Sequence, residues 1–313
     1  MKTKIKLKIA DIIIQMQSIF TPEHLSQEEE KRQIASRFNN FFYRGSQDPD
    51  ILINVEIQDK SPQIHNTKPL FITRHFDSGD ENWRILKKGQ SIIYKCPLKD
   101  KKQVMVVNKK FDRVIAYLLP KKDKERAWNI TDIIYDFLQV LLINYFALRK
   151  LGIFTHAIGV KDLDGKGLLF AGKSGAGKST TARLWHKHSK VMVLNDDRII
   201  VRKNNGNFFI YGSPWHGEFG DYLASRIDSA PIDKLFFIHH APRNNVRRIR
   251  VKEAFNSLYP AIFPTFWDKG CLENIVSFCQ DLVENIPCYS LGFVNDRRVI
   301  DFVRRINIKK EIG

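Results

Sequence analysis

The chain has 313 residues, of which 43% are hydrophobic and 27% are charged, so it is long enough to form two globular domains. It has no apolar run of about eighteen residues, which excludes a membrane-spanning helix, and its four cysteines lack metal-site or disulfide spacing, which fits a reduced cytoplasmic setting. The net charge of +17 comes without a zinc-finger, RNA-recognition or helix-turn-helix pattern, so a solvated basic surface is favoured over nucleic-acid binding and over attraction to an acidic peptide or a phosphorylated ligand.

Residues 1–125 are predicted to form a separate, mostly β module of unknown role. Short runs rich in β-branched residues alternate there with turn residues, which is typical of strands. Strands are expected in the first residues of the chain and at Ile51–Ile57, Leu70–Thr73, Ser91–Lys95, Val104–Val107 and Val114–Leu118. One helix is expected over Ser26–Phe42, where Ser26 and Glu29 form a capping box.

Residues 126–313 are predicted to form a second domain, which follows a charged hinge beginning at Pro120. An amphipathic helix is expected over Asn129–Arg149, and strands and helices alternate after it, as in α/β domains. The expected strands are Phe154–Val160, Gly167–Ala171, Val191–Leu194, Arg198–Arg202, Phe208–Tyr211, Leu235–His239 and Tyr289–Phe293. The expected later helices are Ser257–Phe263, Leu272–Ile286 and Arg297–Arg304.

The segment Gly172–Ser179 reads GKSGAGKS, which is the G-x-x-x-x-G-K-S pattern of a phosphate-binding P-loop. An apolar strand precedes it and a helix that extends to about Lys187 follows it, which is the context that the pattern requires. Lys178 is expected to reach the β- and γ-phosphates, and the Ser179 hydroxyl to bind Mg²⁺. The residues expected to contact ATP are Gly172, Ser174, Gly175, Ala176, Gly177, Lys178, Ser179 and Thr180.

A pair of adjacent acids, Asp196 and Asp197, ends the strand that follows the P-loop helix. Carboxylates at this place can hold Mg²⁺ opposite Ser179 or take a proton from an attacking hydroxyl. Adjacent residues of a strand point to opposite sides, so the two acids are expected to differ in role. The alternative is an acidic turn without catalytic function.

These features together resemble the catalytic core of HPr kinase/phosphorylase over about residues 150–300. The segments that carry the resemblance are Thr155–Ala157, Gly167–Ser179 and Asn195–Arg198. That family shares its nucleotide-binding fold with ATP-dependent phosphoenolpyruvate carboxykinase, so the resemblance implies an α/β fold of this P-loop type.

The resemblance also implies roles for single residues. It implies that Gly175, Gly177 and Lys178 hold ATP phosphates, that Ser179 and Asp197 bind Mg²⁺, and that Asp196 is the catalytic base that deprotonates an acceptor serine. It further implies that His156 lies near Asp196, although an ordinary strand histidine is the alternative. Arg198 is expected either to steady the transferred phosphate or to form a structural salt bridge.

The segment Gly212–Glu218 departs from the arginine-containing glycine turn of HPr kinases and looks like the variant loop of related proteins found beside peptide-modification genes. Two alternatives stay open for it. Trp215 and His216 face the acceptor and Glu218 supports the metal, or the segment is a rigid turn in which Trp215 is packed. The N-terminal half does not resemble that family's N-terminal domain, so HPr is not implied as the substrate.

The leading hypothesis is therefore an ATP- and Mg²⁺-dependent kinase that phosphorylates a hydroxyl, expected to be a serine of a small protein or peptide. A small-metabolite kinase of the same fold is one alternative. A non-catalytic, nucleotide-gated binding protein that uses its basic surface is another. An acidic acceptor and a homo-oligomeric state are left open.

Overall fold

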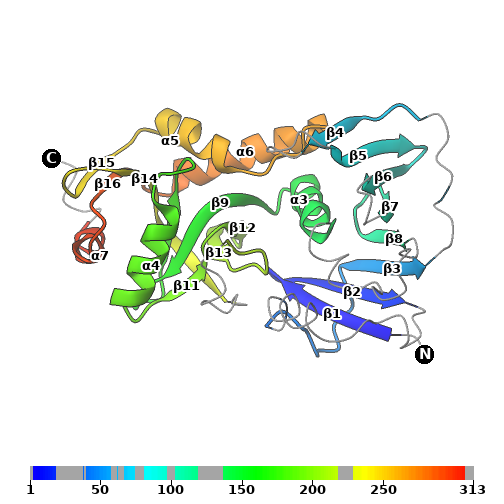
Figure 1. Cartoon of the computed structure of the whole chain (residues 1–313), viewed down its shortest axis with the longest axis horizontal. Coiled ribbons are helices and arrows are strands. Elements are labelled where there is room, and N and C mark those ends of the chain that lie inside the picture. Colours follow the sequence, from blue (N-terminus) through cyan, green and yellow to red (C-terminus); the bar gives the residue numbers. More distant parts are fainter. Residues whose placement is uncertain are drawn as a thin grey trace. The chain divides into compact units, whose positions relative to one another are not determined.

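The computed structural model describes residues 3–18, 38, 40–57, 62, 67–74, 81–96, 103–118, 137–217 and 228–306. It is a mixed α/β structure with two large sheets and few helices (Figure 1). The chain divides into two compact units, Met1–Tyr145 with Phe266–Lys269, and Phe146–Thr265 with Gly270–Gly313. The division falls inside helix α3 (Gln139–Leu148), whereas the boundary expected at residues 125/126 lies outside the described residues.

The first unit is built on one eight-stranded sheet in the order β1-β2-β3-β8-β7-β6-β5-β4. The pairs β2–β3 and β3–β8 are parallel, and the other neighbours are antiparallel. The strands are β1 (Thr3–Ile9), β2 (Ile12–Ser18), β3 (Ile51–Ile57), β4 (Phe71–Arg74), β5 (Glu81–Lys88), β6 (Ser91–Cys96), β7 (Gln103–Asn108) and β8 (Arg113–Leu118). The strands expected from the sequence coincide closely with six of these eight elements.

The strands β2 and β5 are not predicted from the sequence. The turn between β1 and β2 consists of Ala10 and Asp11, which adopt positive φ angles of 45° and 61° without a glycine. The usual sequence signal of a tight hairpin turn is therefore absent. Nearly all of the helix expected over Ser26–Phe42 lies outside the described residues.

The second unit contains an eight-stranded sheet in the order β10-β9-β12-β13-β14-β16-β15, with β11 also paired to β9. Because β10 also pairs with β14, the strands β9, β12, β13, β14 and β10 form a closed circuit of pairings. The strands are β9 (Gly152–Lys161), β10 (Gly167–Ala171), β11 (Met192–Asn195), β12 (Arg198–Asn204), β13 (Asn207–Tyr211), β14 (Ser229–His240), β15 (Asn245–Arg248) and β16 (Cys288–Phe293). Sequence analysis identified each of them except β15, a short edge strand rich in arginine.

Two hairpin turns of this unit lie at sequences typical of tight turns, Asp164-Gly165 and Asn205-Gly206. Gly165, with φ 80°, lies in the turn between β9 and β10. Asn205 and Gly206, with φ 48° and 82°, form the turn between β12 and β13. Both turns use residue types that adopt positive φ readily, so local chemistry predicts them.

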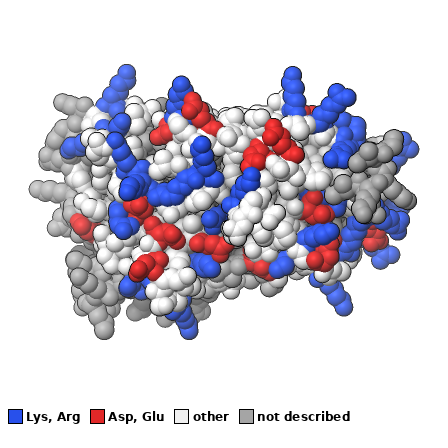
Figure 2. Space-filling view, turned by 180° about the vertical axis from the view of Figure 1, so that it is seen from behind, with Lys and Arg blue, Asp and Glu red and all other residues white. Residues whose placement is uncertain are grey.

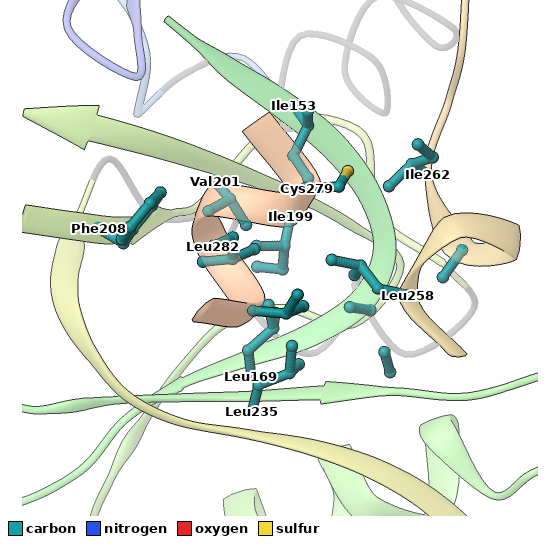
Figure 3. Close-up of a cluster of buried hydrophobic side chains, with 14 of the residues drawn as sticks. Ile153, Leu169, Ile199, Val201, Phe208, Leu235, Leu258, Ile262, Cys279 and Leu282 are labelled. Atoms are coloured by element: carbon teal, nitrogen blue, oxygen red, sulfur yellow. The ribbon is translucent and has the colours of Figure 1, made fainter. Parts of the chain in front are cut away.

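The sheet of the second unit has an apolar core on each face, because side chains of a strand alternate between faces. In β10, Leu169 and Ala171 join the core that contains α6 (Lys269–Asn285) and α5 (Val251–Leu258). Leu168 and Phe170 join the core that contains α4 (Lys178–His188) and α7 (Arg298–Arg304). Figure 3 shows Cys279 and Leu282 of α6 beside Ile199 and Val201 of β12 in the first of these cores. The buried strand β10 therefore carries the predicted P-loop on a support that is packed from both sides.

The helix expected over Ser257–Phe263 is wrong in position. The structure has α5 over Val251–Leu258 and a short 3-10 turn, η4, over Tyr259–Ala261. Pro260 lacks the N–H that would continue an α-helix, and Ala254 and Leu258 bury one face of the earlier segment.

Charges are mixed on the face that Figure 2 shows, where lysine and arginine side chains are interspersed with acidic ones. On this face the described charges therefore form a mixed surface. Within the described ranges, no helix combines the length and the apolar character needed to cross a membrane.

Candidate phosphate-binding site

The P-loop connects the end of β10 to the start of α4. Gly175 and Gly177 adopt φ angles of 77° and 96°, which L side chains rarely tolerate, so glycine is required at both positions. The Gly177 carbonyl accepts hydrogen bonds from the backbone N–H of Thr181 (2.9 Å) and from its hydroxyl (3.0 Å). Helix α4 has no side-chain cap and no acidic residue in its first turn. Its first N–H groups are thus left for an anion, which the partial positive charge of the helix end favours.

Lys178 lies across this loop. Its Nζ donates hydrogen bonds to the carbonyl oxygens of Gly172 (2.8 Å) and Lys173 (3.1 Å). Burial lowers the pKa of the Lys178 ammonium, and the negative charge of Asp197 acts in the opposite direction. The ammonium group is therefore held by the loop carbonyls and interacts electrostatically with Asp197.

Strand β9 brings the P-loop and the acidic pair together. On one edge it pairs with β10, where Ala157 is opposite Ala171, the last strand residue before the loop. On the other edge it pairs with β11 and then with β12, where His156 is opposite Arg198. Asp196 and Asp197 interrupt this second ladder between β11 and β12. The start of the loop thus lies beside one edge of β9 at residues 156–157, and the two acids lie beside the opposite edge.

Asp197 accepts bonds at both carboxylate oxygens. His156 Nε2 lies 2.7 Å from Oδ1, and an Arg198 guanidinium nitrogen lies 2.7 Å from Oδ2. Burial opposes ionisation of Asp197, but the hydrogen bond from His156 and the charges of Arg198, His156 and Lys178 outweigh it and hold the pKa below its usual value. His156 is therefore partnered with Asp197, whereas the resemblance placed it near Asp196.

Asp196 is almost completely buried, with 5% of its surface exposed. Its Oδ1 accepts a hydrogen bond of 2.9 Å from the backbone N–H of Gly217. A Cβ atom at position 217 would lie 2.9 Å from Asp196 Oδ2, so the loop can approach this closely only because residue 217 is glycine. The two neighbouring acids thus have different environments, as their strand position predicts.

The segment Ser213–Gly217 is packed against the protein. Trp215 is buried, and its ring contacts Phe154 edge-on at 5.8 Å between centroids. His216 is half-buried, and its Nδ1 donates to the Gly217 carbonyl at 2.9 Å. This packing favours the rigid-turn alternative for Trp215 over direct contact with an acceptor. Glu218 lies outside the described residues.

The other residues expected at the nucleotide lie along the loop and the start of α4. Ser174 and Ser179 are exposed, while Ala176 and Thr180 are half-buried. No group of three His, Cys, Asp or Glu side chains suited to a metal ion is found in the part of the chain that the structure describes. Mg²⁺ commonly binds through one or two carboxylates and substrate phosphates, so Asp197 and the Ser179 hydroxyl fit it without such a cage.

Asn195 is a residue of the site to which sequence analysis assigned no role. Its buried side chain accepts hydrogen bonds from the backbone N–H groups of Asp197 and Arg198 and donates to carbonyl oxygens of the Ser213–Gly217 segment. The only sequence signal was an amide at the end of an apolar strand, immediately before two acids, which favours a local turn.

Comparisons with known proteins do not identify a family for this chain. No protein-family model matches the sequence, and no curated protein matches it. Among solved structures, the HPr(Ser) kinase/phosphatase from Coxiella burnetii aligns with a TM-score of 0.28 and 11% sequence identity, covering 48% of this chain and 85% of that chain. A likeness at this level decides neither fold nor function.

Proposed function

We propose that the second unit is a phosphoenolpyruvate carboxykinase-like P-loop domain that acts as an ATP- and Mg²⁺-dependent kinase. The proposed acceptor is a hydroxyl group, in the first place a serine of a small protein or peptide. The observation that carries the proposal is the convergence of a P-loop lysine and an acidic pair on two edges of one strand, β9. Phosphoryl transfer needs these two groups, one to bind the phosphates and one to bind metal or accept a proton.

The loop suits triphosphate binding. Positive φ angles at Gly175 and Gly177 turn backbone N–H groups toward the concave side, and space is open where a Gly175 side chain would lie. Lys178 is already desolvated and held by loop carbonyls, so it can pair with a phosphate oxygen with little reorganisation.

The acidic pair suits two separate tasks. Asp197 stays ionised because of its neighbours, which fits a ligand of Mg²⁺ together with Ser179. When bound, Mg²⁺ offsets the negative charge that develops on the transferred phosphoryl group. Asp196, held at one oxygen by Gly217, is proposed as the base that accepts the proton of the attacking hydroxyl. Arg198 and His156 hold Asp197 in place through its two oxygens.

The test is a comparison of Mg²⁺–ATP binding by the wild-type protein and the Lys178→Ala variant, measured by titration calorimetry. We expect the variant to bind at least about ten times more weakly, because the desolvated ammonium contributes a charge-assisted hydrogen bond to the phosphates. The Lys187→Ala variant, altered at the exposed end of α4, is the matched control and is expected to bind like wild type. Equal affinity of wild type and Lys178→Ala would refute the P-loop assignment.

Catalysis is tested separately with γ-labelled ATP, by incorporation of label into serine-containing acceptor peptides and by release of labelled phosphate in their absence. Transfer to a peptide hydroxyl supports the kinase proposal. Tight nucleotide binding with no phosphate transfer or release would instead support the non-catalytic alternative.

A further inference from the structure

We propose that Asn195 is a positioning residue. It connects the acidic pair to the Ser213–Gly217 segment through hydrogen bonds and thereby orients the Asp196 carboxylate. This inference rests on the proposed kinase function for its catalytic consequence. The structural coupling itself can be tested without any activity.

The side-chain amide of Asn195 makes five hydrogen bonds, two at its oxygen and three at its nitrogen, the longest of which is to the Ser213 hydroxyl (3.3 Å). Its Oδ1 accepts from the backbone N–H groups of Asp197 and Arg198, both at 2.8 Å. Its Nδ2 donates to the carbonyl oxygens of Ser213 (2.9 Å) and Trp215 (3.1 Å). An asparagine amide has two donors and two acceptor lone pairs, so the hydrogen-bonding capacity of the group is fully used. The two ends therefore serve different segments, one shaping the acidic turn and the other holding the opposing loop.

Two further bonds join the same segments. The Ser213 hydroxyl donates to the Arg198 carbonyl at 2.6 Å, and the Gly217 N–H donates to Asp196 at 2.9 Å. Asn195 and Ser213 are both buried, with 3% and 0% of their surfaces exposed. A buried network in which every member is satisfied is rigid, while losing one donor leaves carbonyl groups unpaired and destabilises the arrangement.

The consequence for Asp196 follows from the order of these contacts. The bonds to Ser213 and Trp215 fix the loop just before Gly217, whose N–H holds one oxygen of the Asp196 carboxylate. A loop released from Asn195 no longer fixes the direction of that carboxylate. Nucleotide binding depends on the P-loop instead, so the loss should appear in turnover and not in affinity for Mg²⁺–ATP.

Two substitutions separate the two ends of Asn195. The Asn195→Asp variant keeps oxygen acceptors for the turn but loses both donors to the loop. The Asn195→Ala variant loses both sets of bonds. The Asn204→Asp variant makes the same chemical change at an exposed position at the end of β12 and serves as the control.

The first measurement is amide hydrogen exchange, which needs no ligand. In Asn195→Asp we expect exchange at Gly217 to accelerate at least tenfold, with Asp197 and Arg198 changed less than threefold. In Asn195→Ala we expect all three amides to accelerate. Exchange at Gly217 within twofold of wild type in both variants would overturn the proposed coupling.

The second measurement is turnover of Mg²⁺–ATP by the full chain. We expect Asn195→Asp to lower kcat at least tenfold, with the affinity for Mg²⁺–ATP changed less than threefold and Asn204→Asp unchanged. Accelerated exchange with wild-type kcat would show a merely structural role and overturn the positioning role. A wild-type protein without ATP turnover would refute the proposed function, while the exchange pattern would still decide the coupling.

If Asn195→Asp does not fold, Ser213→Ala carries the test, because it removes the hydroxyl contacts with Asn195 and with the Arg198 and Trp215 carbonyls but keeps the bonds from the Asn195 amide to the loop carbonyls. The expected changes have the same direction and are smaller, with a two- to fivefold acceleration at Gly217. Exchange indistinguishable from wild type in a folded Ser213→Ala protein would count against the locked unit.

Discussion

The two units of this protein each contain an eight-stranded sheet, but they differ in whether charged side chains are buried. In the described part of the chain, Lys178 and Asp196 are the charged side chains that are buried, and both belong to the second unit. The first sheet buries the amides Gln15 and Gln103 but no charged group among its described residues. Burying a charge costs free energy unless the group is paired, so its presence points to chemistry and not to stability.

The two sheets also differ in how they join distant parts of the chain. The first sheet consists largely of neighbouring antiparallel hairpins, from β4 to β8 in particular. The second uses β9 and β14, which each pair with three or more strands and connect segments far apart in the sequence. The second arrangement is the one that can collect a loop, a histidine and two acids at a single place.

The largest effect is expected for Asp196→Asn, which removes the proposed base while keeping the size of the side chain. We expect turnover to fall about 10²- to 10⁴-fold, with little change in affinity for Mg²⁺–ATP. The measurement is the initial rate of label transfer from γ-labelled ATP to an acceptor peptide. Asp164→Asn, on the exposed turn between β9 and β10, is the control, and an equal loss there would break the distinction between the buried and the surface acids.

The next effect is expected for Ile53→Ala in the core of the first sheet, where Ile53 is 1% exposed. The cavity should cost about 2–5 kcal/mol of unfolding free energy, measured in urea, because the removed methylene groups are not replaced. Leu169→Ala in the second sheet should cost a similar amount. Affinity for Mg²⁺–ATP should stay within about twofold of wild type for Ile53→Ala, but not for Leu169→Ala. Weakened binding by Ile53→Ala would contradict the assignment of nucleotide binding to the second unit alone.

A smaller effect is expected for Asp197→Asn. The pKa of Asp197 is lowered in the folded protein. The ionised carboxylate therefore adds to the free energy of unfolding above the unfolded pKa of about 3.9, and this contribution is lost as the pH falls through the folded pKa. The stability gap between wild type and variant should be about 1–3 kcal/mol at pH 7 and should narrow below about pH 4. Urea unfolding at both pH values measures it.

The comparison for that prediction is Asp11→Asn in the first sheet, which removes an exposed pair with Lys8. We expect less than about 1 kcal/mol there, because solvent screens surface ion pairs. A gap for Asp197→Asn that widens as the pH falls would contradict the assigned direction.

The smallest effects are expected at turn glycines, where the two units should behave alike. Gly89 between β5 and β6 has φ 59°, Gly206 between β12 and β13 has φ 82°, and space is open beside both. Alanine at either position should cost about 1 kcal/mol through backbone strain alone, measured by urea unfolding. A cost several times larger at one of them would indicate that its turn has a role beyond local geometry.

Much of the second unit could be predicted because its signals are local. The apolar run before the loop, the glycines of the P-loop and the Asp-Gly and Asn-Gly turns each determine their own conformation within a few residues. Strands without such signals were missed, as at β2, whose turn has no glycine, and at β15, whose arginines do not suggest a strand. Helix α5 was misplaced because its start depends on packing of Ala254 and Leu258 and not on a cap.

The sequence by itself determined the G-x-x-x-x-G-K-S segment, the strand before it, the helix after it and the presence of two acids beyond that helix. Only the tertiary structure decided that His156 and Arg198 pair with Asp197, that Gly217 holds Asp196, and that Asn195 joins both segments. The physical reason is that these contacts depend on the register of β9 with β12 and on a loop about 20 residues away in sequence. Hydrogen bonds between segments so far apart leave no periodicity or motif in the chain.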